Sequence, residues 1–255
     1  MAKKKKAPPA PDPTLPSPLS RVILALLVPI ALATFFSSFA ARNLTDSRAM
    51  IAPFLGMLGA ASWFLGIRWY GLPGMALRGG RPLFASIGFA SLGWLALFLA
   101  RLYFVDSVGI GSTGAGLMFF HLIVFEAFCV QLFAFGPFFR NVADWRGPLT
   151  AALAGGVLFA FIGLFYFGEP HELTGAAAFY FVAWGILYGF IRLRTGSILG
   201  SVIIQAVQGF TTWFVLLPPA TLDLYWLNWM HGVVGVIFIV ITWRLWPKTE
   251  EDYRV

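Results

Sequence analysis

Eight long runs of apolar residues alternate with short polar segments along this chain of 255 residues. Each run is close to the ~20 residues that an α-helix needs to cross the hydrocarbon core of a bilayer. The pattern therefore predicts an all-α polytopic membrane protein with about eight transmembrane helices. The predicted spans are roughly 19–41, 50–70, 84–105, 116–139, 149–168, 174–191, 197–217 and 226–246.

The segments outside these runs divide the chain into three expected parts. Residues 1–18 combine a lysine run with a proline-rich stretch, which predicts a disordered cytoplasmic tail. Residues 19–246 form the transmembrane helical domain, and 247–255 form a short cytoplasmic tail. The triplet Ser38-Phe39-Ala40 resembles a signal-peptide cleavage site, but the apolar run before it exceeds the ~7–15 residues of a signal peptide. We therefore expect an uncleaved span.

Composition supports a bilayer environment. The chain is 59% hydrophobic and only 11% charged, with a mean hydropathy of +0.79, whereas soluble domains carry roughly a quarter charged residues. Its single cysteine, Cys129, excludes an intrachain disulfide and a cysteine metal site. The net charge of +7 comes from the lysine tail and from residues flanking apolar runs, so we expect no nucleic-acid partner.

The distribution of positive charge predicts an orientation. With eight spans, fifteen of the 18 lysines and arginines fall in the tails and loops on one side, and Arg42, Arg48 and Arg101 fall on the other. Positively charged residues accumulate on the cytoplasmic side of membrane proteins. We therefore expect both termini in the cytoplasm and a location in a bacterial cytoplasmic membrane.

Ionisable residues within spans are costly and mark candidate functional sites. The fourth span contains His121, Glu126 and Gln131, and Glu126 is the only carboxylate well inside any span. On an α-helix, His121 and Glu126 would lie about 140° apart, too far to form a joint metal site on this helix. Glu126 is either a general base with a shifted pKa or a structural acid that bonds to a neighbouring helix.

The seventh span carries a polar stripe with helical spacing, which must face protein or a wet cavity and not lipid. The stripe either lines a site or forms hydrogen bonds between helices. It consists of Ser201, Gln205, Gln208 and Thr212.

Other polar and small residues have simpler interpretations. Glu169, His171 and Glu172 form either metal ligands or a solvated turn, and we assign no metal. His231 begins the last span and is expected at the membrane interface. The pairs Gly185/Gly189 and Gly155/Gly156 predict close helix packing.

The segment ILYGFIRLRTGSILGSVIIQAVQG, residues 186–209, resembles the CPBP intramembrane proteases, which include CAAX-processing and bacteriocin-processing enzymes. The resemblance covers about 116–217 and is most specific at the TGS turn, which Gly196 would form at a helix end. It implies a CPBP-like helical core. It also implies peptide hydrolysis, in which the glutamate of an EExxxR motif and the histidine of an FxxxH motif activate water. An HxxxN motif then stabilises the oxyanion.

The sequence departs from each of these motifs. At EExxxR it keeps Glu126 but has Ala127 and Gln131, and at HxxxN it has Gln205 and Gly209. FxxxH has two alignments. FAFIG places Gly163 at the histidine position and suits the motif spacing, whereas FGEPH places His171 there, nearer the membrane surface.

These departures lead to two functional hypotheses. In the first, the protein is a non-catalytic relative that binds a partner helix, lipid or cofactor in the polar cavity, as a subunit or assembly factor. In the second, it is a divergent endopeptidase of peptide or prenylated substrates, with Glu126, His171 and Gln205 as its catalytic residues. A weaker third is a transporter, or a pigment- or haem-binding protein that uses His121, His171 or His231. No internal repeat supports transport, and the sequence identifies no cofactor.

Overall fold

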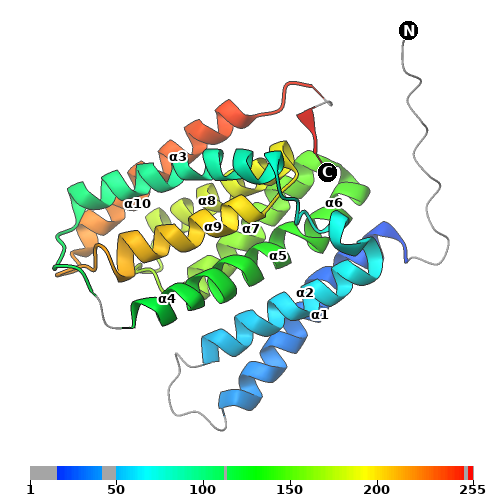
Figure 1. Cartoon of the computed structure of the whole chain (residues 1–255), viewed down its shortest axis with the longest axis horizontal. Coiled ribbons are helices and arrows are strands. Elements are labelled where there is room, and N and C mark those ends of the chain that lie inside the picture. The colour runs from blue at the N-terminus through cyan, green and yellow to red at the C-terminus, as the bar shows by residue number, and fades with distance from the viewer. Residues whose placement is uncertain (1–15, 42–49, 112–113, 250–251, 255) are drawn as a thin grey trace.

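The computed structural model describes residues 16–41, 50–111, 114–249 and 252–254. Its ordered elements are helices of α and π type, arranged as one bundle with the α1–α2 pair at one end (Figure 1). The N-terminal tail is expected to be disordered over residues 1–18, and residues 1–15 of it lie outside the described part. The elements are α1 (Pro18–Ala41), α2 (Ile51–Gly74), α3 (Arg81–Phe104), α4 (Ala115–His121), η2 (Leu122–Cys129), α5 (Val130–Phe135), α6 (Pro137–Arg146), α7 (Pro148–Tyr166), α8 (Gly175–Thr195), α9 (Leu199–Gly209), η3 (Phe210–Phe214) and α10 (Leu224–Leu245).

Seven helical segments of the described chain are long and apolar enough to cross a membrane. The chain is thus an all-α polytopic membrane protein. The predicted seventh span, 197–217, is helical but shorter: α9 has 11 residues and η3 has five, and the helical conformation ends at Phe214. Pro218 and Pro219 follow closely and cannot continue a helix. The count of eight is therefore approximate, because this segment falls short of a full span.

Helix α8 lies at the centre of the bundle. Its apolar window is 72% buried, against 22% for α1, and it packs against α7, α10 and α3. As expected, it ends at Gly196, which adopts a left-handed conformation (φ 76°) that glycine tolerates without strain. The turn that follows leads directly into α9, so the TGS segment joins two buried helices.

Glycines bring α7 and α8 into backbone contact. A Cβ atom added at Gly185 would lie 2.0 Å from the carbonyl oxygen of Gly156, and one at Gly189 would lie 2.2 Å from that of Ala152. No side chain fits at such distances. The close packing predicted from these small residues is confirmed, and it places α8 firmly against α7.

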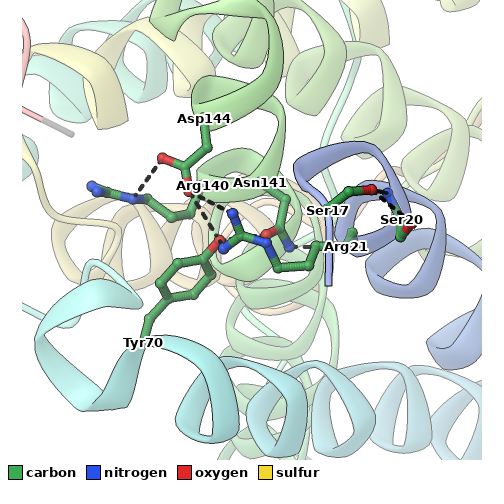
Figure 2. Close-up of polar contacts among 7 residues, drawn as sticks. All are labelled: Ser17, Ser20, Arg21, Tyr70, Arg140, Asn141 and Asp144. Carbon is green, nitrogen blue, oxygen red and sulfur yellow. Dashed lines mark hydrogen bonds and ion pairs between the residues drawn. The ribbon is translucent and has the colours of Figure 1, made fainter. Parts of the chain in front are cut away.

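A polar cluster ties the α1–α2 pair to α6 (Figure 2). Arg21 of α1 donates to the Tyr70 hydroxyl at 2.6 Å and forms an ion pair with Asp144 at 3.5 Å. The Tyr70 hydroxyl also contacts Asn141 of α6, and Arg140 pairs with Asp144 at 3.3 Å. Because α1 packs mainly on α2 and α6, this cluster fixes the position of an otherwise exposed helix.

The C-terminal segment is held against the end of α8. The backbone N–H of Arg254 donates to the Leu193 carbonyl at 2.9 Å, and the Arg192 guanidinium donates to the Arg254 carbonyl at 2.9 Å. Arg194 pairs with Asp252 at 2.6 Å. The described part of the expected soluble tail is therefore docked on the bundle.

The glycine contact generates a stability prediction. We expect Gly185→Ala to destabilise the protein by about 1–3 kcal/mol, because the new methyl group must push α7 away from α8. The measurement is unfolding of the detergent-solubilised protein by titration with denaturing detergent. Gly88→Ala on α3 is the matched control, since a Cβ there meets no atom within 4 Å. Equal stability of the two variants would contradict the close contact.

Candidate functional site

A π-helical segment brings His121 and Glu126 together. The His121 Nε2 atom lies 3.4 Å from Glu126 Oε1, although an α-helix would have placed the two side chains on different faces. The segment from Leu122 to Cys129 is a π-helix, whose hydrogen bonds join residues five apart. Residues i and i+5 therefore share a face. The expectation that His121 and Glu126 point in different directions is wrong for this reason.

The loop after α7 covers the Glu126 carboxylate. Glu126 Oε1 accepts a hydrogen bond from the backbone N–H of Gly168 at 3.2 Å, and its side chain is 9% exposed. Gly168 suits this approach, because a Cβ there would lie 3.0 Å from Phe214 and 3.4 Å from Glu126 Oε1. The carboxylate thus has one neutral donor and one histidine beside it.

Glu169 adds a second carboxyl group to the site. It is buried, and it lines the same small cavity as Glu126. Burial raises its pKa to about 8, and the neighbouring Glu126 carboxylate acts in the same direction. The interpretation of Glu169 as part of a solvated turn is therefore wrong, whereas Glu172 in the same loop is exposed.

The cavity between these carboxyl groups is about 10 Å³ in volume, close to the minimum for one water molecule. Its walls are mostly apolar and aromatic, so it encloses its polar groups tightly. It can hold a water molecule between two carboxyls and an amide, but it has no space for a peptide. The expectation that this polar cavity binds a partner helix, lipid or cofactor is wrong for the same reason. The lining residues are Leu122, Glu126, Phe167, Glu169, Trp184, Gln205, Gly209 and Phe214.

Gln205 bonds to the backbone beside Glu126. Its Nε2 atom donates to the Glu126 carbonyl at 3.0 Å, and its Oε1 atom accepts from Gln131 Nε2 at 2.7 Å. Both amides are buried. The two glutamines therefore link α9 to η2 and α5, and the Gln205 amide is not directed at the Glu126 carboxylate.

The rest of the polar stripe on α9 and η3 also faces protein. Ser201 lies 3.1 Å from the Ser86 hydroxyl on α3, and Gln208 donates to the Tyr180 hydroxyl on α8 at 3.4 Å. Thr212 is fully buried. Of the four stripe residues, Gln205 lines the cavity beside Glu126, while Ser201 and Gln208 form contacts between helices.

The other histidines lie apart from the Glu126 carboxylate. The ring nitrogens of His171 lie 2.8 Å from the Glu169 carbonyl and 2.7 Å from the Leu164 carbonyl. Each ring nitrogen thus lies beside a backbone carbonyl oxygen, and a neutral imidazole donates to one of the two. His231 is fully buried and stacks on Tyr180, so it faces the bundle interior and not the membrane interface. Within the described residues, no three His, Cys, Asp or Glu side chains are placed to hold a metal ion.

The alternative FxxxH position, Gly163, has no room for a histidine. A Cβ atom there would lie 2.9 Å from Phe181 and 3.1 Å from Phe167.

The sequence matches no protein-family model and no curated protein. The resemblance to CPBP proteases therefore rests on the TGS segment and on the residues aligned with the family motifs.

The sequence does not place two residues of this candidate site correctly. The π-helix that turns His121 towards Glu126 leaves no clear sequence signal, and the short polar loop around Glu169 suggests a solvated turn. The aromatic residues Phe167 and Phe214 line the same cavity, and such residues near a loop indicate that it packs against the protein interior.

The burial of Glu169 generates a pH prediction. The folded protein binds the Glu169 proton more tightly than the unfolded chain, where a glutamate has a pKa of about 4.3. Stability should therefore be fully present below about pH 4 and fall as pH rises to about 8, by up to ~1.4 kcal/mol per pH unit. Glu169→Gln should flatten this slope in thermal unfolding measured across pH, whereas the exposed Glu172→Gln should keep it. Parallel slopes for both variants would contradict the burial of Glu169.

Proposed function

We propose that this polytopic membrane protein has a CPBP-like core that no longer hydrolyses peptides. In this proposal it binds another membrane component, as a subunit or assembly factor of a membrane complex. The observation that carries the proposal is the 2.7 Å hydrogen bond between Gln131 and Gln205. These residues occupy the arginine position of EExxxR and the histidine position of HxxxN, so the two departures from the family motifs bond to each other.

An amide pair cannot perform the chemistry that the motifs imply. Glutamine does not titrate, so neither residue can transfer a proton. The Gln205 amide is further held by the Glu126 carbonyl and cannot turn towards a developing oxyanion without breaking that bond. Loss of one oxyanion donor alone lowers rates by about 10²–10³-fold. The pair therefore favours a structural role for this region.

The closed cavity supports the same proposal. A volume of about 10 Å³ accommodates one water molecule, and Phe167 and Phe214 contribute to its walls. The polar interior then serves to hold the helices in place, which leaves the outer surface of the bundle for a partner in the bilayer. We further propose that α9 and η3 together cross the bilayer as a short eighth span. Both termini then face the cytoplasm, in keeping with the asymmetric distribution of lysine and arginine.

A second candidate function is a divergent intramembrane endopeptidase. The 3.4 Å contact between His121 Nε2 and Glu126 Oε1 favours it, because it forms a carboxylate–histidine pair of the kind that activates water. In such a reaction Glu126 would accept a proton from a water molecule while the water oxygen attacks the scissile carbonyl. It would then return that proton to the leaving amine.

A cleavage assay separates the two functions. We expect the purified protein in lipid nanodiscs to leave prenylated and unprenylated peptide libraries uncut, as judged by mass spectrometry. Glu126→Gln and the exposed control Glu172→Gln should then behave like the unchanged protein. Cleavage by the unchanged protein and Glu172→Gln, abolished by Glu126→Gln and His121→Ala, would establish the endopeptidase and overturn the non-catalytic proposal.

The binding half of the proposal has its own measurement. We expect a second membrane component to remain with the protein at constant stoichiometry through two detergents. Glu126→Gln should keep it, because the buried acid lies away from the outer surface. A protein that is free of any partner in its native membrane, shown by cross-linking before solubilisation, would contradict the role as a subunit.

A further inference from the structure

A groove of about 610 Å³ lies on the outside of the bundle, where α10 and α7 flank α8. It shares no lining residue with the Glu126 cavity. Leu153 comes from α7 and Ile186 from α8, and the remaining residues come from α10 and the segment just after it. The lining residues are Leu153, Ile186, Ile239, Thr242, Trp243, Trp246 and Lys248.

The groove forms because α8 is recessed between α7 and α10. The glycine contacts hold α8 against the α7 backbone, and α10 packs on another side of α8. Ile186 is therefore partly covered, while Leu153 of α7 is 41% exposed and Ile239 of α10 is 39% exposed. A recessed helix between two more exposed neighbours forms a trough that faces the hydrocarbon region.

The groove wall is apolar along most of its length. The Thr242 hydroxyl donates to the Phe238 carbonyl of its own helix at 2.8 Å, so it offers no free donor to a ligand. At one end, Trp243 is 79% exposed and Trp246 is 48% exposed, as expected for side chains at the boundary between acyl chains and headgroups.

A cation stands at that end. Lys248 follows the last residues of α10 and is exposed, and its backbone N–H donates to Asp252 at 2.9 Å. The Asp252 carboxylate is itself paired with Arg194 at 2.6 Å. Among the described residues, the Lys248 ammonium group has no hydrogen bond or ion pair. The groove thus combines an apolar trough with one ammonium group that forms no ion pair within the described residues.

We propose that this groove binds one anionic phospholipid, with an acyl chain along α8 and the phosphate headgroup at Lys248. Basic residues beside pockets between transmembrane helices bind anionic headgroups. The volume is within the ~300–1,000 Å³ of typical ligand sites. A partner helix is about 10–12 Å across, so this volume would enclose little more than one of its turns.

The test uses native mass spectrometry of the full chain released from detergent with phosphatidylglycerol or phosphatidylcholine added. We expect one phosphatidylglycerol to remain bound in preference to phosphatidylcholine. Lys248→Gln should reduce this preference about fivefold, the effect of one lysine at a membrane surface. Arg68→Gln, an exposed cation at the end of α2, is the matched control and should keep the preference.

A second variant tests the trough itself. Leu153→Trp changes a partly exposed residue that faces lipid and should block the groove, so that retention of both lipids falls while helicity and elution volume stay unchanged. Equal retention of the two lipids by the unchanged protein would overturn the proposal. An equal loss of the lipid preference in Lys248→Gln and Arg68→Gln would also overturn it. So would retention of a polypeptide instead of lipid, if Leu153→Trp removes that polypeptide. None of these outcomes bears on Glu126, so this proposal and the proposed function can fail separately.

Discussion

The hydrogen bond from Gln205 Nε2 to the Glu126 carbonyl is the contact on which the site depends. In hydrocarbon every backbone polar group must find a partner within the protein. A π-helical segment changes the register of backbone hydrogen bonds, and here a side-chain amide from α9 bonds to a carbonyl within it. Because of this altered register, the side chains of His121 and Glu126 lie on the same face of the helix. A neutral residue on one helix therefore bonds to the π-helical segment that brings two ionisable residues together.

The same constraint explains the arrangement of the remaining polar side chains. Ser201 meets Ser86 of α3, Gln208 meets Tyr180 of α8, and Gln131 meets Gln205. Each contact joins different helices, so the polar stripe fixes the orientation of α9 within the bundle. Individually such bonds contribute only about 0.6 kcal/mol in membrane proteins. Their value lies in orientation, since rotating α9 would leave several amides without partners in an apolar interior.

The sequence predicts those features that depend on local periodicity. Apolar run length identifies the spans, helical spacing identifies the buried stripe from Ser201 to Thr212, and the small residues around Gly185 identify the α7–α8 contact. It does not predict features that depend on a change of register or on tertiary burial. The π-helix that aligns His121 with Glu126 is one such feature. Another is the inward fold of the loop with Glu169, which packs against aromatic residues and bonds to Glu126 through the Gly168 N–H.

Gln131 and Gln205 form one coherent pair in the apolar interior. Replacing only one of two ionisable partners in an apolar core would leave the other buried without compensation, at a cost of several kcal/mol. With glutamine at both positions, one amide donates and the other accepts, and no charge remains to be solvated. Gln131 Nε2 donates to Gln205 Oε1 in this way at 2.7 Å. If the core is CPBP-like as proposed, Gln205→His alone should therefore not confer hydrolysis, because it would remove the amide that donates to the Glu126 carbonyl.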